Sequence, residues 1–197
     1  MDAKHTYVEL AAAYVRGKGL ADEAGLHRFK RTVGLPRVQR VIGALRALAP
    51  RTLLDVGSGR GTFLWPLLDA IPDLPVLAID RLPYRVADVA CVRRGGIGRL
   101  TAARMDVNRL ALADRSFDVV TVLEVLEHLE LPQQAAKEAF RVAERAVVAS
   151  VPSKEDDNPE HLHLFDKGSL EALFLAAGAR RVAIDYVLNH IIAVALR

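Results

Sequence analysis

Short apolar runs alternate with longer segments of helical periodicity along most of the chain. The runs are rich in Val, Ile and Leu. They lack the strict alternation of apolar and polar residues that is typical of a strand with one solvent-exposed face. This pattern is typical of strands that are covered on both faces. We expect five such strands, at Arg51–Val56, Pro75–Asp80, Leu100–Asp106, Asp118–Leu123 and Ala146–Val151.

The intervening segments place apolar residues at helical spacing. Pro132 suits the first turn of a helix, and Gly178 suits the position just after the end of one. A strand–helix alternation of this kind predicts an α/β fold with helices on both faces of a parallel sheet. The expected helices are Thr62–Ala70, Pro83–Arg93, Pro132–Ala143, Lys167–Ala177, and an earlier one that carries Val38 to Leu48 and stops at Pro50.

The end of the chain breaks this alternation. Arg181–Val187 and Ile191–Leu196 are two β-type runs joined by only Leu188, Asn189 and His190. A link this short can join only antiparallel strands, because a parallel pair needs a long crossover. We therefore expect the sheet to carry a C-terminal antiparallel hairpin.

Composition adds a few limits to this picture. The chain has 197 residues, of which 51% are hydrophobic and 26% charged, which fits one folded domain. Its single cysteine, Cys91, allows no internal disulfide and favours a reducing, cytoplasmic location. Uninterrupted apolar runs long enough to span a bilayer do not occur, so no membrane partner is expected.

The charge is uneven along the chain. Residues 1–51 hold ten Lys or Arg against four Asp or Glu, whereas the remainder holds 17 against 20. A solvated helical face is the ordinary explanation of such a basic segment. Contact with an anionic partner such as RNA is the alternative explanation.

The stretch LLDVGSGRGTF, Leu53–Phe63, places glycines at alternate positions directly after a predicted strand. Glycines there let a ligand approach the backbone closely, at the end of the sheet where α/β folds bind ligands. The next predicted strand ends in Asp80, whose carboxylate can accept both hydroxyls of a ribose, so the ligand should contain a nucleoside. The dinucleotide pattern G-x-G-x-x-G/A fails, because Thr62 stands at its third small position.

Four motifs together resemble the class I S-adenosylmethionine-dependent methyltransferases. They are LLDVGSGRGTF, the strand ending at Asp80, MDV at Met105–Val107, and SFDVVTVLEVLEHL at Ser116–Leu129. The resemblance covers residues 36–197 as the methyltransferase domain, with residues 1–35 as an N-terminal helical or lid extension. It implies a Rossmann-like, doubly wound, seven-stranded sheet of order 3-2-1-4-5-7-6.

The resemblance also implies residue roles for binding S-adenosylmethionine. Asp80 would bind the ribose hydroxyls, Asp106 the adenine amino group, and Glu124 would lie beside the methionine part. The full set of expected cofactor-binding residues is Asp55, Gly57, Ser58, Gly59, Gly61, Asp80, Arg81, Asp106, Val107 and Glu124.

Candidate catalytic residues follow the fourth and fifth predicted strands. Methyl transfer is an in-line displacement, so the enzyme has to position a nucleophile and, where needed, remove its proton. Glu124, Glu127 and His128 form E-x-x-E-H, and two further histidines lie in the long polar span Ser150–Phe165. The expected catalytic residues are His128, Glu124 and His163.

The function expected from these features is methyl transfer to an O or N atom of a small molecule, with no metal ion. An alternative is an RNA 2′-O-methyltransferase, because the acidic and histidine pattern is similar to that of the small-RNA 3′-terminal enzymes. In that alternative Glu124, Glu127, His128 and His163 would hold a divalent ion. A third interpretation is a non-catalytic, cofactor-binding partner subunit. Residue patterns do not indicate the oligomeric state.

Overall fold

The computed structural model describes residues 7–18, 34–155 and 157–197. The glycine-punctuated part of the expected N-terminal lid, residues 19–33, lies outside the described residues, as does part of the basic segment. Within the described ranges, no helix combines the length and the apolar character needed to cross a membrane.

Seven strands form one sheet in the order β3-β2-β1-β4-β5-β7-β6, which confirms the expected topology. The apolar runs found in the sequence are confirmed as strands, with ends that differ by a few residues. The strands are β1 Leu53–Val56, β2 Val76–Asp80, β3 Leu100–Arg104, β4 Phe117–Leu123, β5 Ala143–Pro152, β6 Arg181–Val187 and β7 His190–Leu196.

The chain divides into two compact units, Met1–Arg104 and Met105–Arg197. In the first unit, β1 pairs with β2 and β2 with β3, all parallel, and β1 is buried along its whole length. Burial on both faces explains why β1 lacks the alternation of apolar and polar residues. The helices of this unit are α1 Tyr7–Lys18, α2 Pro36–Leu48, α3 Leu64–Ala70 and α4 Pro83–Arg94.

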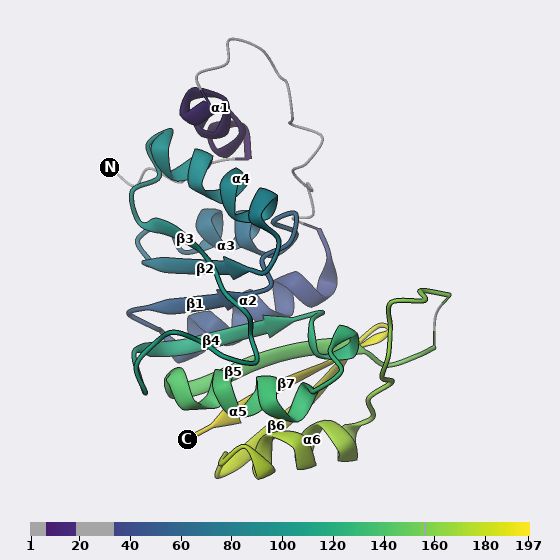
Figure 1. Ribbon diagram of the computed structural model, residues 1–197. Helices are drawn as coiled ribbons and strands as arrows, with labels where there is room; N and C mark the ends of the chain where they lie inside the picture. The colour runs from purple at the N-terminus through teal and green to yellow at the C-terminus, as the bar shows by residue number, and fades with distance from the viewer. Residues whose placement is uncertain (1–6, 19–33, 156) are drawn as a thin grey trace. The chain divides into compact units, whose positions relative to one another are not determined.

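Helix α1 packs against α4, as Figure 1 shows. The buried hydroxyl of Tyr14 donates to Asp88 Oδ1 at 3.1 Å. The two backbones come so close that a Cβ on Gly95 would lie 1.6 Å from the Ala13 carbonyl oxygen. Glycine at this position therefore permits the contact, since any side chain would push the helices apart.

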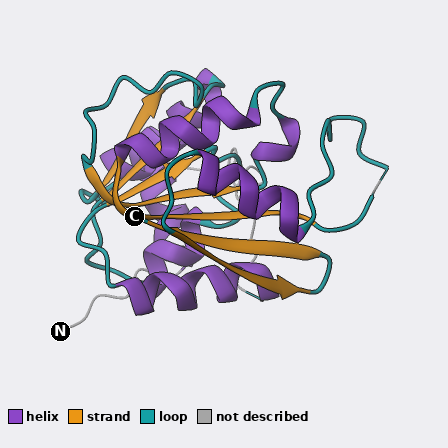
Figure 2. Ribbon diagram, turned by 90° about the horizontal axis from the view of Figure 1, so that it is seen from below, coloured by secondary structure: helices purple, strands orange, loops and turns teal. Residues whose placement is uncertain are grey.

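In the second unit, β4 and β5 are parallel, and β7 lies antiparallel between β5 and β6. The hairpin β6–β7, seen in Figure 2, turns through Leu188 and Asn189 alone, with Leu188 at φ 51°. His190 thus belongs to β7 and pairs with Pro152 at the end of β5. The sequence placed His190 in the link, but the strand register places it beside the residues that follow β4.

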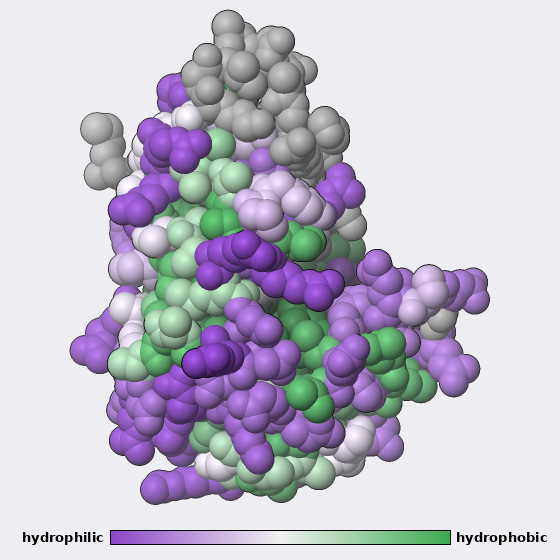
Figure 3. Space-filling view, viewed as in Figure 1, coloured by the Kyte–Doolittle hydropathy of each residue, from purple (hydrophilic) through white to green (hydrophobic). Residues whose placement is uncertain are grey.

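Three helical segments complete this unit, namely the short 3₁₀ helix η2 Leu126–His128, α5 Pro132–Val142 and α6 Lys167–Ala176. Helix α5 buries Ala135, Ala136, Ala139 and Phe140, whereas Gln133, Gln134 and Lys137 are exposed. Figure 3 shows the largely hydrophilic surface over α5. This amphipathic division is the one that the helical spacing of its alanines predicts.

Candidate functional site

The candidate residues fall in both units, and those of the first unit centre on the loop after β1. Gly57, Gly59 and Gly61 have φ of 71°, 54° and 80°, a region that residues with a side chain rarely adopt. Backbone amides of Gly57 and Ser58 both donate to the Ile79 carbonyl oxygen, at 2.8 and 3.2 Å. The loop is thereby fixed to the end of β2.

Two of these glycines differ in their surroundings. A Cβ on Gly59 would meet nothing nearer than the Gly57 carbonyl oxygen, at 3.7 Å, so this side of the loop is open within its unit. A Cβ on Gly61 would lie 1.8 Å from Nε1 of Trp65, whose indole donates to the Arg60 carbonyl oxygen at 3.0 Å. Gly59 therefore leaves room for a ligand, and Gly61 leaves room for Trp65.

Asp80, the last residue of β2, organises this loop with both carboxylate oxygens. Oδ2 accepts from the Gly59 amide at 3.0 Å and Oδ1 from the Leu82 amide at 2.9 Å. Each carboxylate oxygen has two lone-pair sites, so these bonds leave acceptor capacity for ribose hydroxyls. Nearby, Arg81 is exposed and its carbonyl oxygen accepts from Arg104 Nε at 3.0 Å. Asp55 is buried within β1.

In the second unit, the residues after β3 form a tight polar turn. Exposed Asp106 accepts from the Asn108 amide at 2.9 Å through Oδ1, and it forms an isolated antiparallel bridge with Arg109. Val107 is buried. The turn is thus anchored by an apolar side chain while the Asp106 carboxylate faces outward.

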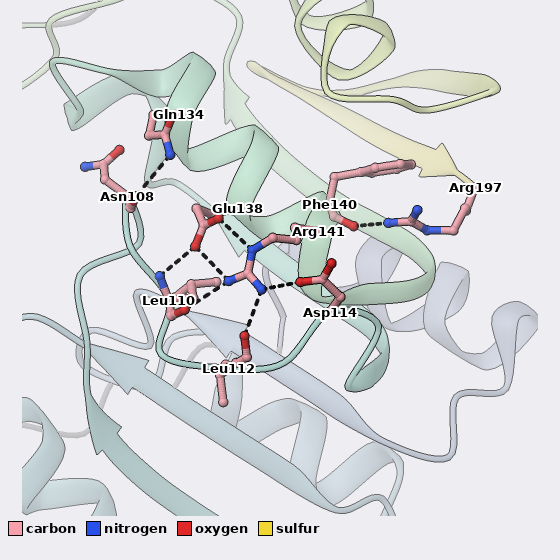
Figure 4. A network of polar contacts seen from close by, with 9 residues as sticks. All are labelled: Asn108, Leu110, Leu112, Asp114, Gln134, Glu138, Phe140, Arg141 and Arg197. Atoms are coloured by element: carbon pink, nitrogen blue, oxygen red, sulfur yellow. Dashed lines mark hydrogen bonds and ion pairs between the residues drawn. The ribbon is translucent and has the colours of Figure 1, made fainter.

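The segment that follows this turn is held on α5 by Arg141 (Figure 4). Its guanidinium donates two bonds to the Glu138 carboxylate, at 2.7 and 2.9 Å, and one to Asp114 at 2.7 Å. It also donates to the carbonyl oxygens of Leu112 and Leu110, at 2.8 and 2.9 Å. The Leu110 amide in turn donates to Glu138 at 2.8 Å. Sequence analysis missed this network, because Leu110, Leu112 and Asp114 lie about 30 residues before Arg141 along the chain.

We expect the substitution Arg141→Met to lower the free energy of unfolding by about 2 kcal/mol at neutral pH, since it removes several charge-assisted hydrogen bonds. The hydrogen bond from Arg141 holds the pKa of Glu138 below its ordinary value. The contribution of the pair is therefore present above the unfolded-state pKa of Glu138, and it is lost as pH falls through the folded-state pKa.

Urea unfolding across a pH series checks this expectation, with Lys137→Met as the matched control. Lys137 is exposed on the same helix, so its substitution should leave stability nearly unchanged. A loss of stability for Arg141→Met that becomes smaller towards acidic pH would support the assignment, since the bonds to the carbonyl oxygens of Leu110 and Leu112 remain. Equal stability of the variant and the wild type at neutral pH would contradict it.

Glu124 follows β4 with a positive φ of 54°. Its amide donates to the Ser150 carbonyl oxygen at 2.9 Å, and the Ser150 hydroxyl donates to Glu124 Oε1 at 2.6 Å. His190 Nε2 lies 3.2 Å from Oε2 of the same carboxylate. Glu124 is thus oriented from both sides by residues of β5 and β7. Sequence reasoning identified Glu124 but missed Ser150 and His190, because only the β5–β7 register brings them to it.

Beyond Glu124 lies a compact group of acidic and imidazole side chains. Glu127 of η2 is fully buried, and His128 Nε2 lies 4.0 Å from its Oε1. The His128 ring is 4.7 Å from the His161 ring, centroid to centroid, and His128 Nδ1 is 2.9 Å from the Glu160 carbonyl oxygen. From the sequence, His128 is expected to be catalytic together with His163, the next histidine of the loop, rather than with His161.

That next histidine, His163, makes a different contact. Its Nε2 is 2.9 Å from the Leu129 carbonyl oxygen, and its ring lies 6.0 Å from that of Phe165. A carbonyl oxygen only accepts, so Nε2 carries the proton and donates. His163 therefore fastens the loop to the residue after η2, whereas His161 is the histidine that joins Glu127 and His128.

Comparison with known proteins shows which proteins this chain is similar to. A family model described as "Methyltransferase domain" matches residues 54–148. The chain is 37% identical over 97 residues to the tRNA U34 carboxymethyltransferase of Edwardsiella ictaluri, covering 48% of this chain and 29% of the relative. It is 34% identical over 102 residues to the demethylmenaquinone methyltransferase of Renibacterium salmoninarum, covering 52% and 40%. The chain thus matches less than half the length of either relative.

Among solved structures, the fold is similar to that of the magnesium protoporphyrin IX methyltransferase of Synechocystis PCC 6803, solved with SAH bound. The TM-score is 0.67 at 18% identity, over 94% of this chain and 93% of that one. The glycine loop and the strand-end Asp80 both lie within the matched residues, and the sheet has the order that is expected from the sequence. Residues 54–148 therefore match a methyltransferase domain, and the fold is shared with methyltransferases solved with SAH, the demethylated form of S-adenosylmethionine.

Proposed function

We propose that this chain transfers a methyl group from S-adenosylmethionine to an O or N atom of a small molecule. The observation that carries the proposal is the glycine loop, which Asp80 holds in a conformation that leaves the Gly59 side open. A nucleoside ligand needs such a bare backbone beside a strand-end carboxylate. The residues of the first unit therefore fit the cofactor that the family uses.

The residues that hold the cofactor are proposed from the family pattern together with this local geometry. In the first unit, Asp80 accepts the ribose hydroxyls through the acceptor capacity left by its two backbone bonds. The bound cofactor supplies a methyl group on a positively charged sulfur. A nucleophile can attack the methyl carbon, and the sulfur leaves as the thioether. The proposed set is Asp55, Gly57, Ser58, Gly59, Gly61, Asp80 and Arg81 in the first unit, with Asp106, Val107 and Glu124 in the second.

The acceptor's proton is proposed to leave through His128. Its Nδ1 donates to the Glu160 carbonyl oxygen, so the neutral ring presents the Nε2 lone pair as a base. Glu124 is proposed to line the reaction centre, since Ser150 and His190 hold its carboxylate in one orientation. His163 is proposed to act by positioning the loop, because its Nε2 is bonded to the Leu129 carbonyl oxygen.

The names of the similar proteins favour a small acceptor over a polymer. One acts on magnesium protoporphyrin IX and another on demethylmenaquinone, as their names state. A third acts on tRNA U34, and this likeness, together with the basic residues 1–51, is the observation that favours RNA as the second candidate acceptor. The two candidates predict different products.

Transfer of a labelled methyl group from S-adenosylmethionine into a fractionated host lysate distinguishes them. We expect the label to enter the low-molecular-weight fraction when the wild-type chain is added. The variant His128→Ala should reduce the rate of transfer, since it removes the proposed base. Label that enters an RNase-sensitive polymer would overturn the small-molecule proposal, and full turnover by His128→Ala would overturn the role of His128.

A further inference from the structure

Glu127, His128 and His161 each direct one potential ligand atom towards the others in the second unit. These three atoms all lie within 4.8 Å of one another, in the part of the chain that the structure describes. Two of the residues come from η2, and the third comes from the loop between β5 and α6. The cluster lies outside the set assigned above to cofactor binding, although it shares His128 with the proposed acceptor site.

Backbone hydrogen bonds fix the loop beside η2. The amides of Leu162 and His163 both donate to the Glu127 carbonyl oxygen, at 2.7 and 3.2 Å. Just before them, Oδ1 of the Asn158 side chain accepts from the Glu160 amide at 3.1 Å. The backbone carbonyl oxygen of Asn158 accepts from the His161 amide, also at 3.1 Å. His161 is therefore delivered to Glu127 by main-chain contacts rather than by chance orientation of a long side chain.

The tautomer of His128 is set by its outer contact. The Glu160 carbonyl oxygen can only accept, so Nδ1 carries the proton and the Nε2 lone pair points inward. That lone pair lies 4.0 Å from Glu127 Oε1, so two electron-rich atoms face each other. A cation bound between them would contact both atoms. An imidazole whose outer N–H donates to a carbonyl while its inner nitrogen is bare is the arrangement typical of a metal ligand.

The burial of Glu127 also favours a bound cation. The Glu127 carboxylate is fully buried, and a buried carboxylate is costly unless cationic groups or a metal ion lie beside it. The two imidazoles are only partly buried, with 33% of the His128 side chain exposed. The buried carboxylate of Glu127 and the partly exposed imidazole rings suit a site that an ion enters from the solvent side.

We propose that Glu127, His128 and His161 bind one divalent transition-metal ion of the Zn²⁺ type. Two imidazoles and a carboxylate are a donor set that such ions favour, at bond lengths of about 2.0–2.2 Å. Ligand atoms around a tetrahedral ion are then about 3.4 Å apart. The ligand atoms now lie up to 4.8 Å apart, so they would have to approach one another by about 1 Å to bind one ion. Three protein ligands leave a fourth position for water.

This ligand set differs from the one that the sequence suggested as an alternative. Glu124 is held by Ser150 and His190, and His163 donates to the Leu129 carbonyl oxygen. Neither is therefore part of the proposed site, whereas His161 is. When the ion is bound it occupies the His128 Nε2 lone pair, so the metal-bound form cannot use that nitrogen as a base. The metal site stands on its own geometry, whatever the methyl acceptor proves to be.

The test is a titration of the metal-free chain with Zn²⁺ in competition with a chromophoric chelator. We expect one equivalent to bind, and the variants His161→Ala and Glu127→Gln to weaken binding by about 100-fold or more. Loading with Co²⁺ adds an independent readout, since visible absorption bands report a low-coordinate ion with nitrogen and oxygen ligands. Thermal unfolding without metal identifies any variant that fails to fold.

Glu155→Gln is the matched control, because it removes an exposed carboxylate of the same loop that the site does not include. It should bind Zn²⁺ within a few-fold of the wild type. Two results would overturn the proposal. One is the absence of stoichiometric Zn²⁺ binding by the wild type, which would show that these three residues hold no ion. The other is equal affinity of His161→Ala and the wild type, which would place the ion elsewhere.

Discussion

Replacing Asp80 by alanine should weaken the binding of S-adenosylmethionine at least tenfold, which is about 1.4 kcal/mol. The substitution removes the proposed acceptor of the ribose hydroxyls. It also removes the carboxylate that accepts from the Gly59 and Leu82 amides and so holds the glycine loop. Hydrogen bonds to a charged group contribute more than neutral ones, so the loss of both functions should be readily measured.

Isothermal titration of S-adenosylmethionine into each protein measures this effect. The variant Asp73→Ala is a suitable control, because Asp73 is an exposed carboxylate of the same unit that precedes β2. Its affinity should match that of the wild type. An unchanged affinity for Asp80→Ala would remove Asp80 from the cofactor site.

The substitution Gly61→Ala should lower the free energy of unfolding by about 2–4 kcal/mol and also weaken cofactor binding. Two separate penalties apply. Gly61 has φ of 80°, where a side chain is strained, and its Cβ would lie 1.8 Å from Nε1 of Trp65. Trp65 is buried and its indole donates to Arg60, so it has little freedom to move away.

Gly43→Ala is the matched control for this substitution. Gly43 lies inside α2, and a Cβ there would meet nothing within 4 Å. Alanine favours a helix interior by about 0.5–1 kcal/mol, so this variant should be slightly more stable than the wild type. Urea unfolding followed by the fluorescence of Trp65, the single tryptophan, measures both variants. A Gly61→Ala protein of wild-type stability would show that the loop has room for a side chain.

The strands and most helices could be predicted from sequence, because each is encoded by its own residues. Burial on both faces makes β1 apolar throughout, and Pro132 opens α5 as its position in the pattern indicates. The glycine loop was predictable for the same reason, since three positive φ values leave their mark as three glycines. The fold and the glycine loop were thus predictable because local residue patterns encode them.

The side-chain contacts between distant residues of the second unit could not be predicted in this way. His190 reaches Glu124 only because β7 pairs with β5, and the register of that pair is a property of the folded sheet. The distinction between His161 and His163 depends on which way a loop without periodicity turns its side chains. Residue type and spacing mark such histidines as candidates but leave their partners open.

We propose that the chain turns over S-adenosylmethionine and does not merely bind it. The most direct measurement is the amount of S-adenosylhomocysteine that the purified chain forms from S-adenosylmethionine in the presence of a small-molecule extract of the host. We expect multiple turnovers, equal in number to the methyl groups transferred and strongly reduced in Asp80→Ala. Tight binding of S-adenosylmethionine without any S-adenosylhomocysteine formed would contradict it and would identify a non-catalytic, cofactor-binding subunit.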